Sequence, residues 1–417
     1  MKLKRVVVTG LGALTPIGNN VSEYWDGLIN GKSGAGLITH FDAEKFKTKF
    51  ACEVKNFDIH DFMNRKEARK LDKYAQYAMI ASQEAIEDAK IDLETINKLK
   101  VGVIWGAGIG GIETFHNEVT NFATGDGTPR FNPFFIPKMI ADIAPGHISI
   151  KYGFMGPSYT TVSACASSAN AIIDALNYIR LGHCNVIVTG GSEAAVTQSG
   201  VGGFNALQAL STNNDNFKEA SRPFDANRDG FVLGEGAGAL ILEEYEHAKA
   251  RGAKIYAEVI GGGLSSDAHH MTAPHPEGTG VVAVMNNCIE NAGIKPEEVE
   301  LINTHGTSTP LGDVAELKAI TKVFGDHAKN ININSTKSMT GHLLGAAGAI
   351  EAISSILSLQ NGIVPPTINH SSDDEKIDSD LNLTLNKAQK REATIAMSNT
   401  FGFGGHNACI LLKKLNE

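Results

Sequence analysis

The stretch Arg5-Val-Val-Val-Thr-Gly-Leu-Gly12 decides how we interpret the fold of this chain. Its valines and threonine predict a buried strand, and its two glycines predict a tight turn directly after that strand. The pattern returns at Ile255-Tyr-Ala-Glu-Val-Ile260, which three more glycines follow. We therefore divide the chain into two similar α/β halves, residues 1–253 and 254–417, and the echo between them suggests an ancient duplication.

Short β-branched runs alternate with helical patterns along the rest of the chain, which is typical of an α/β fold. Strands are predicted at residues 5–9, 100–105, 158–162, 185–189, 239–242, 255–260, 300–303 and 408–412. Helices are predicted at residues 70–89, 112–122, 280–292, 313–324 and 345–359. The polar stretch 369–380 is predicted to be a surface loop.

The composition excludes several classes of protein. Hydrophobic residues make up 42% of the 417 residues, which is enough for a core. The net charge of −9 disfavours general nucleic-acid binding. No apolar run reaches the roughly 18 residues of a membrane span, and early glycines interrupt the first apolar run too soon for a signal peptide.

The cysteine pattern argues against a disulfide framework and against a thiolate zinc site. The five cysteines are widely spaced, odd in number and contain no CxxC pair. We therefore expect a soluble protein of a reducing compartment, the cytoplasm, with no metal and no membrane association.

Cys165 is the leading candidate for a nucleophile. It lies in Val162-Ser-Ala-Cys-Ala-Ser-Ser168, between a predicted strand and a run with helical apolar spacing. The free N–H groups and the dipole at a helix N-terminus favour a thiolate there. The alternative is a small buried residue beside a tight turn, and a structural role is favoured for the other four cysteines.

Two histidines are candidates for partners of this cysteine. His305 lies in Leu301-Ile-Asn-Thr-His-Gly-Thr-Ser-Thr-Pro310, where a strand ends in a turn rich in hydroxyl groups. His342 follows Lys337 in Ser335-Thr-Lys-Ser-Met-Thr-Gly-His342 and precedes a helix rich in glycine and alanine. Either histidine alone is more often structural, but a cysteine at a helix start, two histidines at loop junctions and a lysine form a plausible constellation.

This constellation suggests carbon–carbon bond formation at a thioester. Acyl transfer needs a thiolate, and hydrolysis would need only one histidine as a base. Two neutral imidazoles that each donate an N–H can bind a developing enolate oxygen.

Three other motifs are weaker. The run Gly106-Ala-Gly-Ile-Gly-Gly111 fits GxGxxG, but a helical pattern at residues 112–122 and a loop at 124–129 follow it, where a dinucleotide site needs a second strand that ends in an acidic residue. The run Asp225-Ala-Asn-Arg-Asp-Gly230 begins like a calcium loop, but position 236 is glycine where the loop needs glutamate. His269, His270 and His275 are close in the sequence, but Pro274 and Pro276 predict a loop there, which favours the rim of an active site over a metal site.

Longer motifs make the chain resemble the β-ketoacyl-acyl carrier protein synthases, most closely those of type II. They are Arg222-Pro-Phe-Asp-Ala-Asn-Arg-Asp-Gly-Phe-Val-Leu-Gly-Glu-Gly236, the His305 run, Ser335 to Gly348, and Asn399-Thr-Phe-Gly-Phe-Gly-Gly405. The resemblance covers essentially the whole chain. It implies a thiolase-like fold, with two α/β halves in five αβαβα layers, and a homodimer.

The resemblance also implies an activity and a set of site residues. The activity is a decarboxylative Claisen condensation of malonyl-acyl carrier protein with a cysteine-bound acyl chain, which elongates a fatty acid. Cys165 would accept the acyl group, His305 and His342 would bind the malonyl thioester oxygen, and Phe403 would gate the site and complete the oxyanion hole. Other implied site residues are Lys337 with Glu351, the pantetheine contacts Thr307 and Thr309, and the acyl-pocket residue Ile109. His270, in the histidine loop described above, is also predicted to contact the substrate at the rim of the site.

The implied partner is the acyl carrier protein, whose phosphopantetheine carries the substrates, so no separate cofactor is expected. Carrier proteins of this pathway are acidic, and docking therefore needs a local basic surface. Arg65, Lys66, Arg69, Lys70 and Lys73 recur at helical spacing. The resemblance favours Lys66, Arg69 and Lys70 for docking over a merely solvated helix face.

Several alternatives stay open at this point. Ser163-Ala-Cys-Ala166 looks more like the type I synthases, and His406-Asn407 stands where Thr-Asn is more usual, so chain-length preference is undetermined. A polyketide ketosynthase would use the same chemistry. A papain-like cysteine hydrolase is the alternative from another class, because His305 follows Cys165 at a papain-like spacing.

Overall fold

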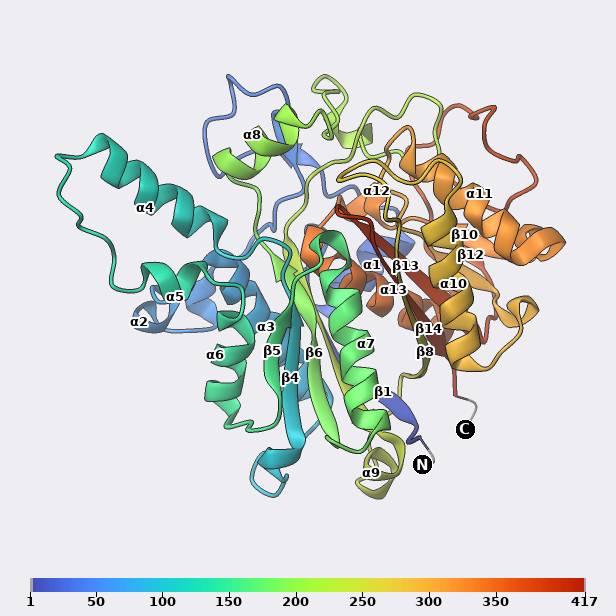
Figure 1. The fold of residues 1–417 in the computed structure, drawn as a ribbon, viewed down its shortest axis with the longest axis horizontal. Helices are drawn as coiled ribbons and strands as arrows, with labels where there is room; N and C mark the ends of the chain where they lie inside the picture. The colour runs from blue at the N-terminus through green and yellow to red at the C-terminus, as the bar shows by residue number, and fades with distance from the viewer. Residues whose placement is uncertain (1–2, 416–417) are drawn as a thin grey trace.

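The computed structural model describes residues 3–415, and its centre is one ten-stranded sheet in the order β10-β9-β13-β14-β8-β1-β7-β6-β4-β5 (Figure 1). These strands are β1 (Val6–Leu14), β4 (Val101–Gly106), β5 (Ser158–Thr161), β6 (Val186–Glu193), β7 (Gly236–Glu244), β8 (Ala257–Ser266), β9 (Leu301–Asn303), β10 (Asn332–Asn334), β13 (Ile395–Gly402) and β14 (His406–Lys413). Two small sheets pair β2 (Gly36–Leu37) with β3 (Phe50–Ala51) and β11 (Ile363–Val364) with β12 (Gln389–Lys390).

The α-helices cover the faces of this sheet. They are α1 (Val21–Ile29), α2 (Arg65–Ala68), α3 (Lys73–Asp88), α4 (Ile112–Thr124), α5 (Phe135–Met139), α6 (Ile143–Tyr152), α7 (Ser167–Arg180), α8 (Gln198–Ala206), α9 (Tyr245–Ala250), α10 (Thr279–Ala292), α11 (Gly312–Phe324), α12 (Lys337–Thr340) and α13 (Ala347–Asn361). Two 3-10 turns, η3 (Ala164–Ala166) and η7 (Leu344–Ala346), lead into α7 and α13. Within residues 3–415, none of the helices combines the length and apolar character needed to cross a bilayer.

The sheet is symmetric about its centre. There β1 and β8 pair through only two residue pairs, Val7 with Glu258 and Val8 with Ala257. Outward from this point the strand order matches β7 with β14, β6 with β13, β4 with β9 and β5 with β10. Because the central pairing is short, the two groups of five strands can diverge and enclose helices between them.

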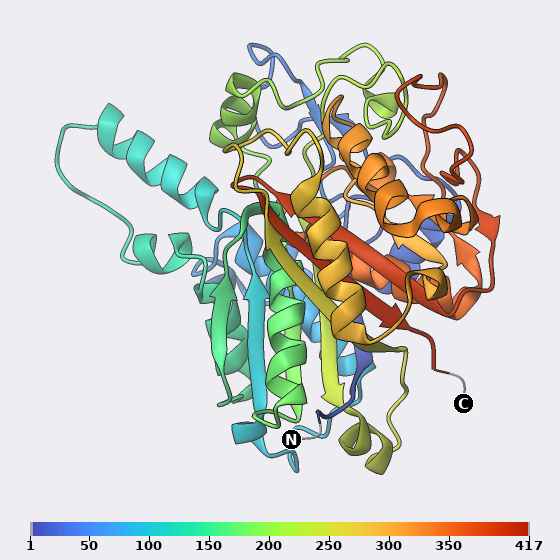
Figure 2. The ribbon, with the colours of Figure 1, turned by 45° about the vertical axis from the view of Figure 1, so that its right-hand side comes forward.

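The helices complete a five-layered arrangement. On one outer face α3 contacts β1, β6 and β7, while α6 contacts β4 and β5; on the other outer face α10 contacts β8 and β14. Helices α7 and α13 contact each other and strands of both groups, so they form the middle layer (Figures 1 and 2). The predicted αβαβα architecture is therefore confirmed.

The middle layer lies at the centre of the hydrophobic core. Ile172 and Leu176 of α7 are almost fully buried, as are Ile350 and Ile353 of α13, and all four belong to one apolar cluster. This close packing fixes the two turns at the starts of α7 and α13, and these turns reach the functional site.

The glycines of the opening motif do not form the predicted turn. Gly10 and Gly12 lie inside β1, where an added Cβ would overlap carbonyl oxygens of α3. In the second half Gly263 lies inside β8, and its Cβ would overlap the carbonyl of Val284 in α10. The glycines are needed because a helix crosses each strand too closely for a side chain, so the strands continue past them.

The spacing of the basic run at residues 65–73 predicted a single helix, but the run is divided between two helices and the link between them. Asn64 caps the four-residue α2, and the chain then breaks before α3. Asp72 starts α3 anew by accepting the backbone N–H of Tyr74 and both the N–H and hydroxyl of Thr114. Lys66 therefore lies in α2, while Arg69 and Lys70 lie in the link between the helices.

Candidate active site

Cys165 lies in η3, two residues before the start of α7, as the sequence predicted. Ala164 has a left-handed backbone with φ 50°, which turns the chain sharply from β5 into the helix. The Ser167 hydroxyl donates to the carbonyl of Ala164, and its oxygen accepts the N–H of Ser163. The turn therefore holds the cysteine rigidly, and only 7% of its surface is exposed.

His305 and His342 are placed by loops of the second half. His305 follows β9, and its backbone N–H donates to the buried carboxylate of Glu316 at 2.9 Å. His342 follows α12, and its backbone N–H donates to the carbonyl of Val232 at 2.7 Å, while its own carbonyl accepts the N–H of Gly234. Both imidazoles are thus held from the backbone, which leaves their rings free to face a substrate.

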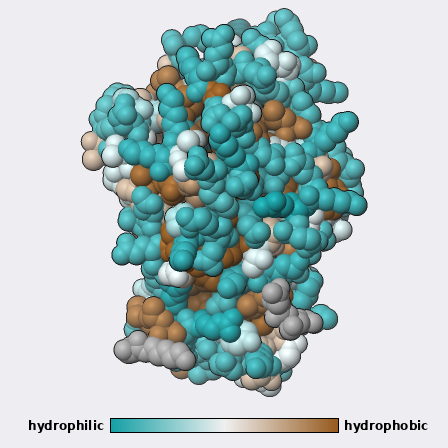
Figure 3. Space-filling view, turned by 90° about the vertical axis from the view of Figure 1, so that its right-hand side faces the viewer, coloured by the Kyte–Doolittle hydropathy of each residue, from teal (hydrophilic) through white to brown (hydrophobic). Residues whose placement is uncertain are grey.

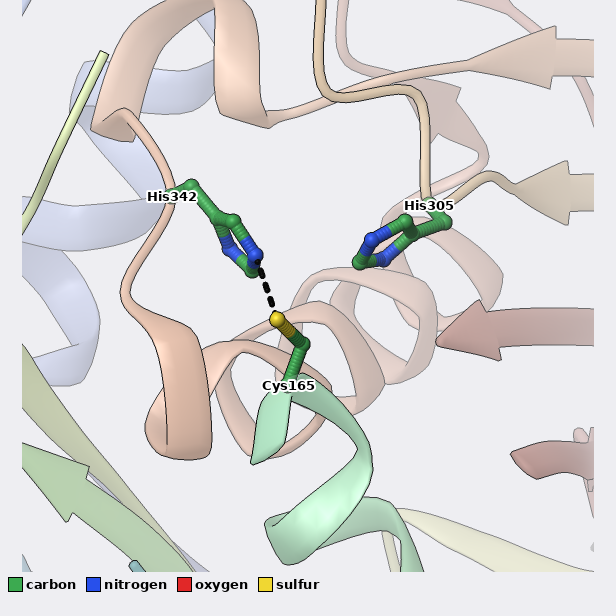
Figure 4. Close-up of side chains that lie close together, drawn as sticks. All are labelled: Cys165, His305 and His342. Atoms are coloured by element: carbon green, nitrogen blue, oxygen red, sulfur yellow. Dashed lines mark hydrogen bonds between the residues drawn. The ribbon is translucent and has the colours of Figure 1, made fainter. Parts of the chain in front are cut away.

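The structure brings the sulfur and the two rings together (Figure 4). The Nε2 atom of His342 lies 3.0 Å from the Sγ atom of Cys165. The two imidazole rings are 5.2 Å apart between centroids and nearly perpendicular, at 86°. One ligand-type atom from each of the three residues lies within 4.8 Å of the other two. A thioester can therefore meet all three side chains at once.

Both histidines are held neutral. Burial, followed by the positive charge of Lys337, lowers the pKa of His305 and of His342 well below the ordinary histidine value. Neutral imidazoles can donate an N–H to a developing oxyanion without carrying a charge themselves.

The expected thiolate at Cys165 is wrong for the resting site. Burial raises the pKa of the Cys165 thiol to about 12, although Lys337 and the backbone N–H of Phe403 both lower it. The helix N-terminus favours a negative charge, but removing the sulfur from water costs more in this pocket. The resting site therefore holds a neutral thiol beside a neutral imidazole.

Lys337 and Glu351 form a buried ion pair behind the two histidines. Burial raises the pKa of Glu351 to about 7, and the charge of Lys337 opposes that rise. Lys337 is the member of the pair whose positive charge, together with burial, lowers the pKa of both histidines.

Several of the remaining predicted residues line one cavity of about 700 Å³. Cys165, His305 and His342 line this cavity together with Ile109, His270, Thr307, Thr309 and Phe403. The two threonine hydroxyls lie 3.1 Å apart, as a polar pair on the cavity wall. Lys337 and Glu351 lie behind the cavity wall, and Lys66, Arg69 and Lys70 lie outside the cavity.

The sequence reasoning missed three residues that shape the site. The ring of Phe231 meets His342 edge-on at 5.4 Å, and the ring of Phe401 lies 5.6 Å from His305. Glu316 holds the His305 loop from α11, where it looked like an ordinary helix residue. Only the three-dimensional contacts reveal these roles, because no spacing in the chain links these residues to the histidines.

Cys165, His305 and His342 are also donor types that Zn²⁺ accepts. However, the charge of Lys337 acts on both rings and opposes a bound cation. The calcium-like run is a structural loop instead. Arg228 there pairs with Asp374, and Asp225 accepts the backbone N–H groups of Ser371 and Ser372.

Known proteins resemble the chain over almost its whole length. Residues 3–248 match the family described as Beta-ketoacyl synthase, N-terminal domain, and residues 256–371 match Beta-ketoacyl synthase, C-terminal domain. A 3-oxoacyl-[acyl-carrier-protein] synthase 2 of Staphylococcus aureus (strain COL) is 48% identical over 412 residues, 99% of this chain and 98% of its own. The protein of the same name from Synechocystis sp. is 47% identical over 414 residues, 99% of each chain.

Solved structures share the fold. A beta-ketoacyl synthase from Burkholderia phymatum STM815 superposes with a TM-score of 0.92 at 35% identity, covering 99% of this chain and 100% of its own. The ishigamide ketosynthase/chain length factor gives a TM-score of 0.93 at 33% identity, with the same coverage.

Fold and site together define an acyl-transferring condensing enzyme with a thiolase-like fold. The chain belongs to the β-ketoacyl synthase family, which removes the cysteine-hydrolase alternative.

Proposed function

We propose that this enzyme is a type II 3-oxoacyl-[acyl-carrier-protein] synthase, which condenses malonyl-acyl carrier protein with an acyl chain held on Cys165. The observation that carries the proposal is the neutral imidazole of His342 at 3.0 Å from the Cys165 sulfur, with a second neutral imidazole across the same cavity. Substrates would arrive on the phosphopantetheine of the carrier, and the hydroxyls of Thr307 and Thr309, which line the cavity, would contact that arm.

The first half-reaction loads the acyl group. The Cys165 thiol gives its proton to His342 as the sulfur attacks the acyl thioester, and the pantetheine sulfur leaves and takes that proton. The backbone N–H of Phe403 already points at the sulfur, and together with the N–H of Cys165 it would stabilise the tetrahedral oxyanion.

The second half-reaction forms the carbon–carbon bond. The malonyl carboxylate leaves as CO₂, and the electron pair left behind forms an enolate. Neutral His305 and His342 each donate an N–H to the enolate oxygen, His342 in the tautomer that carries its proton on Nε2. The α-carbon then attacks the acyl carbon on Cys165, and the Cys165 sulfur leaves. No strong base is needed, because loss of CO₂ replaces removal of a proton.

The test is incubation with acyl-carrier and malonyl-carrier, followed by mass spectrometry of the protein and of the product. We expect one acyl adduct on Cys165, a 3-oxoacyl product two carbons longer, and neither after Cys165→Ala. Cys52→Ala is the matched control, since Cys52 is also a buried cysteine whose pKa burial raises to about 12, but it lies outside the cavity. An adduct elsewhere, or hydrolysis without condensation, would contradict the proposal. Product length separates a type II enzyme from a type I or polyketide synthase.

We propose that the carrier protein docks at Lys66, Arg69 and Lys70. Lys66 and Arg69 are exposed, Lys70 is half-buried, and within residues 3–415 none of the three makes an ion pair. Unpaired basic groups of this kind suit an acidic partner. One similar solved structure is described as an acyl-carrier protein in complex with its ketosynthase.

We also propose that the enzyme is a homodimer formed through the β5 edge of the sheet. β5 ends the strand order, and Met155 and Val162 beside it are 63% exposed. On the same side, α4 and α5 project as an arm (Figure 1), and exposed phenylalanines at 115, 122, 131 and 134 lie along it. The opposite side, which carries α10 and α11, is mostly hydrophilic (Figure 3). Light scattering should give twice the chain mass.

The compartment and the division of the chain are parts of the same proposal. Free thiols suit the reducing cytoplasm, and all five cysteines of the described chain are free. The symmetric strand order supports a division into residues 1–253 and 254–417.

A further inference from the structure

The glycine run that resembled a dinucleotide motif binds an internal carboxylate. Glu193, the last residue of β6, is fully buried. Its Oε2 atom accepts the backbone N–H of Gly108 at 2.8 Å, and its Oε1 atom accepts those of Ile109 at 3.2 Å and Gly110 at 3.1 Å. The N–H groups that a phosphate would need are therefore already used.

The same carboxylate also reaches the second half of the chain. The backbone N–H of Gly345, in η7, donates to Glu193 Oε2 at 3.1 Å. An added Cβ would lie 2.7 Å from Oε2 at Gly108 and 2.8 Å from it at Gly345. Glycine is needed at both positions because the carboxylate approaches the backbone so closely.

The symmetry of the fold relates the turn at Gly345, whose N–H binds Glu193, to the turn at Cys165 in the first half of the chain. Ala164 and Leu344 have matching left-handed backbones, with φ 50° and φ 47°, and each begins the turn into its helix. Gly345 is therefore the counterpart of Cys165. In the first turn the Cys165 N–H lies beside the cysteine's own sulfur and lowers the pKa of that thiol, whereas in the second turn the equivalent N–H of Gly345 donates to Glu193.

The bound segments form part of the wall of the acyl cavity. Gly108, Ile109 and Leu344 all line it, and Ile109 is 42% exposed. Glu193 itself does not line the cavity, so it cannot touch a substrate. Any influence on the reaction must therefore pass through the position of the segments that it binds.

We propose that Glu193 is a positioning residue that fixes Ile109 in the cavity wall and thereby sets which acyl chain lengths the enzyme accepts. This inference rests on the proposed function, because it needs the cavity to hold the acyl chain. Four N–H donors on one buried carboxylate make an anchor that a neutral amide cannot reproduce, since the amide NH₂ group donates hydrogen bonds and accepts none.

The test compares kcat/KM for a series of acyl-carrier substrates from short to long. In Glu193→Gln we expect the ratio between the preferred and the disfavoured lengths to fall by roughly fivefold or more. The negative charge of Glu193 also raises the pKa of the Cys165 thiol, so losing that charge would change kcat/KM for every chain length by the same factor. The ratio between two lengths cancels this common factor and is therefore the right readout. The matched control is Glu243→Gln, another fully buried carboxylate, which binds Arg251 far from the cavity.

A double-mutant cycle locates the effect. If Glu193 acts through Ile109, Glu193→Gln should change the length ratio no further in an Ile109→Ala background. An undiminished effect in that background, or an unchanged ratio in Glu193→Gln, would overturn the inference. If Glu193→Gln does not fold, Gly108→Ala replaces it, because the methyl group displaces the loop while the carboxylate stays; an unchanged ratio there overturns the inference equally.

The failure of this inference differs from a failure of the proposed function. A missing acyl adduct on Cys165 of the unaltered enzyme, or an unchanged length ratio in Ile109→Ala alone, would show that the cavity does not hold the acyl chain as proposed. The inference about Glu193 would then fail together with the proposed function. If the unaltered enzyme forms the adduct and Ile109→Ala alters the length ratio, but Glu193→Gln leaves that ratio unchanged, only the role of Glu193 is contradicted.

Discussion

His342 Nε2 lies 3.0 Å from Cys165 Sγ, although 177 positions separate the two residues in the chain. Each side chain comes from the turn region before one of the two central helices, α7 and α13. Because these helices pack against each other in the middle layer, the contact depends on the core of the protein and not on a flexible loop. The predictions below follow from this fixed geometry.

The two histidines should be needed for decarboxylation even without the nucleophile. In a Cys165→Ala background, which blocks acyl loading, we expect CO₂ release from malonyl-carrier to continue. Adding His305→Ala or His342→Ala should reduce it about 10²- to 10³-fold, because each ring donates one hydrogen bond to the enolate oxygen. His327→Ala is the control, since His327 bonds the carbonyl of Val299 outside the cavity. Unchanged CO₂ release in both variants would contradict the assignment.

The reactivity of Cys165 should rise steadily with pH. Its thiol pKa is raised to about 12 by burial, so the thiolate is a small fraction at neutral pH and grows about tenfold per pH unit. We expect the iodoacetamide rate at Cys165, followed by mass spectrometry, to climb from pH 6 to 9 without a plateau. A free cysteine peptide should level off near its ordinary pKa of about 8.5. A rate at Cys165 that is already flat above neutral pH would indicate a resting thiolate instead.

Charge reversal should weaken carrier binding. We expect the triple variant of Lys66, Arg69 and Lys70 to glutamate to bind the carrier at least about tenfold more weakly at low salt. The difference should shrink as salt rises, because exposed charges are screened. Lys318→Glu, a reversal of an exposed lysine on α11, should have little effect. Equal carrier affinity in the triple variant and in the Lys318 variant would place docking elsewhere.

The sequence predicted most elements of the fold because local patterns determine them. Helix 280–292 and strand 300–303 match α10 and β9 within a residue or so, since apolar spacing marks their buried faces. The stretch around Cys165 also carried its own signals, a strand followed by a helix of regular apolar period. Local motifs at strand ends and helix starts therefore singled out Cys165, His305 and His342, and all three line one cavity.

What local patterns could not predict depends on neighbours distant in the chain. The glycines of β1 were predicted to be a turn, because the helix that crosses them lies some 70 residues further on. The thiolate was predicted from the helix start alone, without the desolvation that the assembled pocket imposes. The prediction of a single basic helix was wrong because Asp72 accepts a hydrogen bond from Thr114, some 40 residues further along the chain, and caps a new helix, α3, that begins at Lys73.

The close crossing of α3 over β1 should make Gly12 intolerant of a side chain. An added methyl group would overlap the backbone of Ala81, so strand and helix would have to separate. We expect Gly12→Ala to lower the free energy of unfolding by about 1–3 kcal/mol or more. Gly146→Ala is the matched control, because Gly146 lies in α6 with no atom within 4 Å of its added Cβ. That change should be neutral or stabilising by about 0.5–1 kcal/mol. Equal denaturation midpoints for both variants would contradict the role of the crossing.

Gly402 should be essential because it keeps the Cys165 N–H open. It ends β13 as Glu193 ends β6, and both strands span eight residues in matching places of the sheet. A Cβ on Gly402 would lie 3.1 Å from the Cys165 backbone nitrogen and 2.7 Å from the carbonyl oxygen of Ser163. The Glu193 carboxylate thus occupies the space before the N–H of Gly345, whereas Gly402 places no side chain before the corresponding N–H of Cys165, where a substrate oxyanion would bind.

We therefore expect Gly402→Ala to slow acyl transfer to Cys165 about 10²-fold, the effect of losing one oxyanion donor. Rapid-quench measurement of the acyl adduct tests this, since it isolates the loading step. Gly36→Ala is the control, because the nearest atom to its added Cβ is 3.9 Å away. The thermal midpoint of Gly402→Ala is measured as well, to show that slower loading does not result from unfolding. A stable Gly402→Ala enzyme that loads at the normal rate would mean that the Cys165 N–H does not bind the oxyanion.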